Sequence, residues 1–261
     1  MSTIAPALER ARADVPGPVL VAIAAAWIVA VVAELTGAAG AFHHDALIEG
    51  GPPLWAALLL FLGAWQAMVA AMMLPSSLPL IRLFSVVSRQ QEKSGRARAA
   101  FLGGYAAVWT GFGAIAFLGD VAVHHAVAAV DVLSERPWLL MGSTLALAGA
   151  FQFSDLKERC LSKCRQPGPY LLARYRRGAG AAFRLGVGHG LYCLGCCWAL
   201  MLVMFAVGVA VLWWMAALTA VMVFEKTARH GDGLAPVVGV GLLAIAAVVF
   251  AQPWLIGVLA G

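Results

Sequence analysis

Charged residues are scarce in this sequence. Lys, Arg, Asp and Glu make up 12% of its 261 residues, whereas hydrophobic residues make up 62%. A soluble domain carries about 25% charged residues, and a disordered chain has few hydrophobic ones, so both classes are excluded. The sequence also lacks a Walker, Rossmann or His-Glu zinc-protease pattern. A nucleotide-driven pump and a soluble type of metalloenzyme are therefore not favoured, and an enzyme is less favoured than a protein without catalytic activity.

Long hydrophobic runs fill most of the chain. Roughly 20 apolar residues cross a hydrocarbon core as a helix, and a helix is expected because its backbone groups are paired internally. We predict that residues 1–261 form a single domain, an all-α bundle of about seven transmembrane helices. The predicted spans are residues 18–36, 54–74, 100–119, 137–153, 185–207, 209–224 and 236–256.

The basic residues predict the orientation of these spans. Loops rich in Lys and Arg stay on the cytoplasmic side. With seven spans, all of the 18 Lys and Arg residues except Arg136 fall on the same side as the N-terminus. We therefore place the N-terminus inside and the C-terminus outside. The net charge of +5 follows from this arrangement, and no nucleic-acid partner is needed to explain it.

The stretch GHGLYCLGCCWALM, residues 188–201, holds three of the five cysteines. In a helix, His189, Cys193 and Cys197 share one face, and Cys196 lies beside them. The span runs outward, so His189 lies near the inner interface and the cysteines lie progressively deeper. A lone cysteine in a core is a small hydrophobic residue. Three cysteines close together beside a histidine predict a metal site or thiol chemistry, and packing alone is the alternative.

Methionines of the second span reach a similar depth. In WQAMVAAMMLP, Met68 and Met72 lie one helical turn apart. The span runs inward, so these thioethers reach the inner half of the membrane, where His189 and Cys193 are expected. Methionine is most often a core residue, but thioethers also bind soft ions. The predicted intramembrane metal ligands are His189, Cys193, Cys196, Cys197, Met68 and Met72.

A second pair of cysteines follows the fourth span, in LKERCLSKCRQP. Cys160 and Cys164 are spaced i, i+4, so in a helix they share one face near the membrane surface. The flanking Lys157, Lys163 and Arg165 favour thiolates. The pair predicts an intracellular metal relay or a reactive pair, and a solvent-facing helix with incidental cysteines is the alternative.

Two further groups of polar residues stand near the ends of spans. Glu225 and Lys226 close the sixth span, and we interpret Lys226 as an interfacial anchor. The outer loops carry two histidine pairs, His43-His44 and His124-His125, near Asp and Glu residues. Imidazole and carboxylate suit borderline divalent ions, whereas the sulfur-rich inner residues suit Cu(I). The role of the outer histidines stays open.

These motifs together resemble the family of predicted metal-binding integral membrane proteins, domain of unknown function 2182. The resemblance covers WQAMVAAMMLP, GGYAAVW, LAGAFQFSDLKERCLSKCRQP and GHGLYCLGCCWALM, and GCCW followed by LM is its most specific part. It implies a multi-pass protein of the bacterial inner membrane and no established reaction. The metal site that it implies consists of Cys160, Cys164, Cys193, Cys196 and Cys197.

One departure from this family concerns a possible ligand. Members usually have a Met-Asn pair after the cysteine helix, whereas this chain has Ala210 and Val211. If the methionine binds a metal elsewhere in the family, this protein binds less tightly or through another ligand.

Two classes of function remain, besides a structural subunit of a membrane complex. The favoured class is a protein that handles copper for transport, storage or delivery. Its expected partners are lipid, a metal ion and a membrane or periplasmic protein. The alternative is a thiol-redox protein. Redox motifs usually place the attacking thiol at a helix N-terminus, whereas Cys193 and Cys196 lie inside a continuous apolar run. Gly186 and Gly190, four residues apart, predict close helix packing.

The predicted topology can be tested with reporter fusions. Fusions after Glu49 and after Lys93 flank the second span, so we expect them to report opposite sides of the membrane. Signals from the same side would show that the depth assigned to the methionines and cysteines is wrong.

Overall fold

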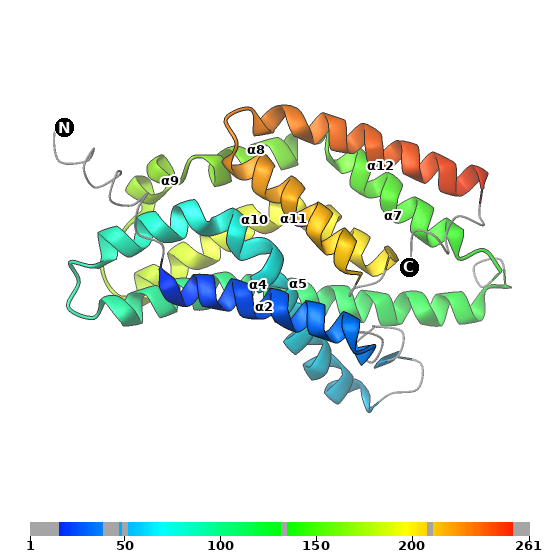
Figure 1. Ribbon diagram of the computed structural model, residues 1–261, viewed down its shortest axis with the longest axis horizontal. Coiled ribbons are helices and arrows are strands. Elements are labelled where there is room, and N and C mark those ends of the chain that lie inside the picture. Colours follow the sequence, from blue (N-terminus) through cyan, green and yellow to red (C-terminus); the bar gives the residue numbers. More distant parts are fainter. Residues whose placement is uncertain (1–15, 39–46, 49–51, 132–134, 208–210, 253–261) are drawn as a thin grey trace.

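Helices form all of the regular structure that can be described. The computed structural model describes residues 16–38, 47–48, 52–131, 135–207 and 211–252, and no strand occurs within these ranges. The main elements, shown in Figure 1, are α2 (Gly17–Leu35), α4 (Leu54–Ser88), α5 (Ser94–Ala129), α7 (Trp138–Phe151), α8 (Asp155–Arg165), α9 (Pro167–Arg174), α10 (Ala179–Val207), α11 (Leu212–Thr227), the short 3-10 helix η2 (Gly231–Gly233) and α12 (Leu234–Ala251). The predicted all-α helix bundle is confirmed.

Five of these helices are long and apolar enough to cross a membrane, namely α2, α4, α5, α10 and α12. Large apolar side chains cover their outer surfaces. Val21 of α2 is 68% exposed and Ile115 of α5 is 72% exposed. Exposed apolar surface on this scale marks contact with lipid, and the hydrocarbon core accepts helices because they pair their own backbone groups. The chain is therefore a multi-pass membrane protein.

Two of the seven predicted spans are too short to cross a membrane alone. Helix α7 has 14 residues, fewer than the predicted span 137–153, and α11 has 16, the predicted length. At about 1.5 Å per residue neither alone crosses about 30 Å of hydrocarbon. Helices α7 and α8 meet at a 63° bend. Only together are they long and apolar enough to form one membrane span. The described residues thus give five or six candidate spans. The sequence shows that these segments are apolar, but an apolar run does not reveal where its helix begins and ends.

Helix α4 continues through the prolines at which its predicted span ended. It includes Pro75 and Pro79, runs on to Ser88, and bends in its middle (Figure 1). Proline has no N–H, so the carbonyl four residues before it loses its helical partner. For Pro75 this is the carbonyl of Ala71, which accepts a hydrogen bond of 3.1 Å from the indole of Trp27 on α2. Helix α2 thus stabilises the bend.

Helices α5 and α10 pack closely because glycines allow their backbones to meet. A Cβ atom on Gly104 of α5 would collide with the Phe183 carbonyl, and one on Gly186 of α10 would collide with the Phe101 carbonyl. Small residues allow this approach between membrane helices. Gly190 also faces α5, so the close packing predicted from the glycine spacing is confirmed. This contact fixes α10, which carries three of the cysteines.

Replacing Gly104 with alanine should destabilise the protein, because the added methyl group meets the backbone of Phe183. Gly103 is the matched control on the same helix, because a Cβ atom there has no neighbour within 4 Å. We expect Gly104→Ala to lower the Tm in detergent. Gly103→Ala should leave it unchanged or raise it, since alanine is favoured over glycine within a helix by about 0.5–1 kcal/mol. Equal shifts in the two variants would contradict the close contact.

Candidate metal centre

The five cysteines lie on two helices that pack against each other. They are Cys160 and Cys164 on α8 and Cys193, Cys196 and Cys197 on α10, and all five are buried and free. The side chains of Cys164 and Cys196 contact each other across the two helices. Cys160 covers Gly195, where a Cβ atom would lie 2.5 Å from its Sγ. The two cysteine motifs, which the sequence suggested as separate features, therefore form one group, here called the cysteine cluster.

Helix α8 is amphipathic, and its buried face carries two of these cysteines. Ser154 caps the helix by accepting a hydrogen bond of 3.2 Å from the backbone N–H of Lys157. The buried residues of α8 are Lys157, Cys160, Leu161 and Cys164, and this spacing defines one helical face. The shared face predicted for Cys160 and Cys164 is confirmed, but it faces α10. The alternative of a solvent-facing pair is therefore wrong.

The thiols of α10 have different neighbours. Cys196 and Cys197 both donate to the carbonyl oxygen of Cys193, at 3.0 and 2.9 Å. The side chains of Cys193 and Cys197 also contact each other, and Cys197 Sγ lies 3.7 Å from Met73 Sδ of α4. Among the described residues, no three His, Cys, Asp or Glu side chains are arranged to hold one metal ion. In this conformation, a metal ion would therefore be bound by fewer than three of these side chains, and thioethers would supply further ligands.

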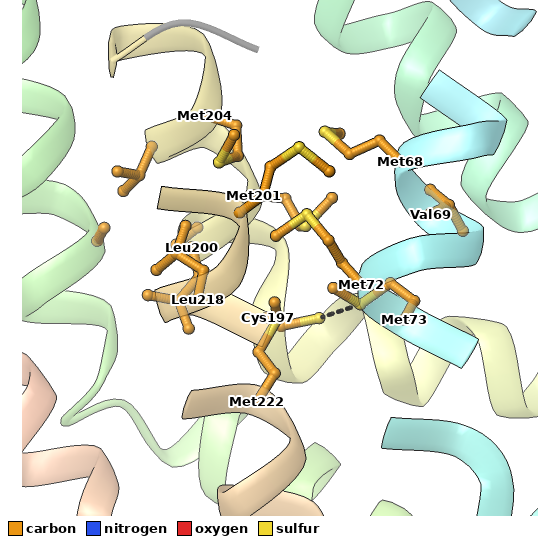
Figure 2. Close-up of a cluster of buried hydrophobic side chains, with 14 of the residues drawn as sticks. Met68, Val69, Met72, Met73, Cys197, Leu200, Met201, Met204, Leu218 and Met222 are labelled. Carbon is orange, nitrogen blue, oxygen red and sulfur yellow. Dashed lines mark hydrogen bonds between the residues drawn. The ribbon is translucent and has the colours of Figure 1, made fainter. Parts of the chain in front are cut away.

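Buried methionines surround Cys197, as Figure 2 shows. They are Met68, Met72 and Met73 of α4, Met201 and Met204 of α10, and Met222 of α11. None of these side chains is more than 4% exposed. The group, here called the methionine cluster, contains the predicted ligands Met68 and Met72, but Met73 makes the direct contact with Cys197. Met201 belongs to the LM that follows GCCW, whereas Met222 gave no signal in the sequence beyond its position in an apolar run.

The alignment of α4 with α10 differs from the predicted depths. Met73 lies opposite Cys197, and Ser77 lies opposite His189. Met68 and Met72 therefore lie further from His189 than the sequence indicated, next to Met201 and Cys197 (Figure 2). The cause is the length of α4, because a helix that continues past Pro75 places these methionines near its middle and not near its inner end.

Lys226 of α11 brings an ammonium group to the cysteine cluster. Its Nζ lies 3.1 Å from both Cys193 Sγ and Ser76 Oγ, and the residue is 5% exposed. The predicted interfacial position of Lys226 is therefore wrong. In the sequence, Lys226 stands at the end of an apolar run, as an interfacial anchor would. The packing of α11 against α4 shows that its side chain turns inward.

A chain of hydrogen bonds connects His189 to Cys193. His189 Nε2 lies 3.2 Å from Ser77 Oγ, Ser77 Oγ donates to the Tyr105 hydroxyl at 3.3 Å, and that hydroxyl lies 3.1 Å from Cys193 Sγ. The ring of His189 also stacks on Tyr105, with centroids 5.5 Å apart. His189 is thus buried and joined to the cysteine cluster through Ser77 and Tyr105, two residues that the sequence did not single out.

A buried ion pair fastens α8 to α11. Lys157 Nζ donates to both carboxylate oxygens of Glu225, at 3.0 and 2.8 Å, and each side chain is 1% exposed. Arg165 donates to the carbonyls of Glu225, Ala228 and Arg229 at the end of α11. A cation is favourable at a helix C-terminus. These contacts hold α8, and with it Cys160 and Cys164, against the bundle.

The outer histidines of α5, His124 and His125, are not part of the cysteine cluster. His124 Nδ1 lies 3.0 Å from the carbonyl and 3.7 Å from the carboxylate of Asp120, one turn earlier on α5. His125, the next residue on α5, is exposed. The residues His43, His44, Asp45, Glu49 and Ala210 lie outside the described part of the chain.

The fold and the site together define a multi-pass helical membrane protein with thiols and thioethers gathered in its interior. A family model described as copper chaperone, PpoB2, matches residues 62–249. The match covers more than half of the chain and includes all five cysteines and the methionine cluster, so the chain belongs to this copper chaperone family. No curated protein and no solved structure matches the chain.

Replacing Lys157 with methionine should lower the free energy of unfolding by about 3–5 kcal/mol, because Glu225 is left as an unpaired buried charge. Replacing both residues with methionine should recover most of the loss, since apolar substitution of a whole buried pair is often neutral. Thermal unfolding of the purified variants in detergent measures both effects. A single variant as stable as the wild type would show that the pair does not hold α8 in place.

Proposed function

We propose that this protein carries Cu(I) inside the membrane and hands it on to a partner by exchange between sulfur ligands. One observation supports the proposal above all others. Thiols from α8 and α10 and thioethers from α4, α10 and α11 meet in one buried region of a chain that belongs to a copper chaperone family. The metal is cargo here, and no catalytic residue is proposed.

The chemistry of the region supports a soft, monovalent ion. Thiolate and thioether sulfur select Cu(I), whereas Mg²⁺, Ca²⁺ and Mn²⁺ prefer oxygen. Cys193 and Cys197 touch each other on one face of α10, and Met73 meets Cys197 from α4. We therefore propose Cys193, Cys197 and Met73 as the central ligands, with Met72 and Met68 next to them in the methionine cluster.

The remaining cysteines suggest a route by which the ion reaches these ligands. Cys160 and Cys164 are each 8% exposed, whereas the cysteines of α10 are at most 1% exposed, so the α8 pair is the outermost part of the cysteine cluster. Cys164 contacts Cys196, and we propose that Cu(I) passes from α8 to Cys196 and then to the central ligands. Exchange between neighbouring sulfurs keeps the ion bound at every step. His189 stays a candidate ligand whose ring would have to leave Ser77.

The setting of this function is also part of the proposal. The basic residues favour a cytoplasmic N-terminus, and the resemblance to the predicted metal-binding integral membrane proteins favours the bacterial inner membrane. A soluble periplasmic protein or a second membrane protein would then receive or supply the ion.

Metal binding by the purified chain tests the proposal. We expect the wild type in detergent to retain about one or two equivalents of Cu(I), and the triple variant Cys193→Ser, Cys196→Ser, Cys197→Ser to lose most of it, because a hydroxyl is a poor ligand for soft ions. Elemental analysis after removal of free metal gives the stoichiometry. Equal copper content in the two proteins would assign the cysteines to packing alone.

A methionine variant separates copper binding from a thiol-redox function. Thioethers bind Cu(I) but take no part in thiol–disulfide exchange. Replacing Met72 and Met73 with leucine nearly conserves volume and costs less than about 1.5 kcal/mol per site. It should weaken Cu(I) binding and leave the oxidation of the cysteines in air unchanged. Met141→Leu on α7, which is buried but outside the methionine cluster, is the control and should bind Cu(I) like the wild type.

A further inference from the structure

The buried charges of the bundle do not cancel. Among the described residues, the buried side chains with a formal charge are Lys157, Glu225 and Lys226. Both oxygens of Glu225 are bound by Lys157, so this pair is neutral. The described residues show no carboxylate in an ion pair with Lys226. One positive charge is therefore left over in the interior.

Among the described residues, thiols are the groups placed to balance this charge. Lys226 Nζ contacts a hydroxyl, Ser76 Oγ, and a thiol, Cys193 Sγ, each at 3.1 Å. A hydroxyl can accept a hydrogen bond from the ammonium group, but it carries no charge. An isolated buried ammonium is costly, and in a membrane such a group is found with a counter-charge or a functional role. The group that can become an anion in contact with Lys226 is the Cys193 thiol.

We propose that Lys226 is a fixed counter-charge that makes the central site select a monovalent ion held by two thiolates. This inference rests on the proposed function. Cu(I) bound by the thiolates of Cys193 and Cys197 forms a complex with a single negative charge, which Lys226 neutralises. The S–H bonds of both thiols break as the two copper–sulfur bonds form, and the two protons are released to solvent, so one Cu(I) replaces two protons. A divalent ion on the same two thiolates gives a neutral complex and leaves the ammonium group of Lys226 without a partner.

The geometry limits the site to two thiolates. A divalent ion with three thiolates would also balance Lys226, but no three His, Cys, Asp or Glu side chains among the described residues are arranged around one point. Cys196 contacts Cys164 on α8 as well as Cys197, whereas Cys193 contacts Cys197 and is the thiol that lies 3.1 Å from Lys226. Lys226 therefore acts as a positioning residue. It donates a hydrogen bond to the sulfur of Cys193, and Ser76 holds it in place, as outer partners hold the ligands of other metal sites.

The test is a competition between Cu(I) and Zn(II) for the purified full-length chain in detergent, with both ions buffered by chelators. Replacing Lys226 with methionine removes the charge and nearly conserves the length of the side chain. We expect the ratio of Cu(I) to Zn(II) affinity to fall roughly tenfold or more, because the loss of a charge this close weakens an anionic complex most. Lys226→Arg keeps the charge and should keep the wild-type ratio, which a role in packing alone would not predict.

Two further variants make the test decisive. Lys226→Gln is neutral but can still bond to Ser76, so it replaces the methionine variant if that protein does not fold, and the same fall in ratio is expected. The control is Lys93→Met, which removes the charge of an exposed lysine between α4 and α5, and it should keep the wild-type ratio. An unchanged ratio in the neutral Lys226 variants, with Cu(I) still bound, overturns this inference alone. A wild type that binds no Cu(I) overturns the proposed function and this inference with it.

Discussion

The interior of this protein depends on one constraint, which is that polar groups placed among apolar helices must find partners inside the bundle. The ion pair of Lys157 and Glu225 meets this constraint where α8 joins α11. Arg165 adds bonds to the carbonyls at the end of α11. Because these contacts hold α8 against the bundle, its cysteines face those of α10. The pairing of buried charges thus supports the position of two of the five cysteines.

The same constraint explains the other polar contacts near the site. The carbonyl that Pro75 leaves free is bound by Trp27, and the buried His189 is bound by Ser77. Lys226 differs from Lys157, because its hydrogen-bond partners are a hydroxyl and a thiol, and among the described residues no carboxylate forms an ion pair with it. The other buried charges of the described residues, Lys157 and Glu225, are paired. The ammonium group of Lys226 beside Cys193 can therefore neutralise the negatively charged metal complex that we propose. This links the stability of the bundle to the ion that we propose it carries.

The site could be predicted from the sequence in its chemistry but not in its geometry. Helical spacing predicted that Cys160 and Cys164 share a face, and it grouped Cys193 with Cys197, because both patterns depend only on residues of one helix. The meeting of α8 with α10 could not be predicted, since it depends on an ion pair between residues far apart in the sequence. Met73 was not chosen for the same reason, because its contact with Cys197 depends on how α4 lies along α10.

The sequence by itself determined that this chain is a helical membrane protein and that three of its five cysteines lie in one apolar segment, because composition and helical periodicity are properties of the chain alone. Only the tertiary structure decided where α4 bends, which thioether meets which thiol, and that Lys226 turns inward. These features depend on contacts between helices, and such contacts are set by the packing of glycines and the pairing of buried charges across the bundle. For this reason Lys226, which resembles an anchor in the sequence, becomes part of the candidate metal centre in the folded protein.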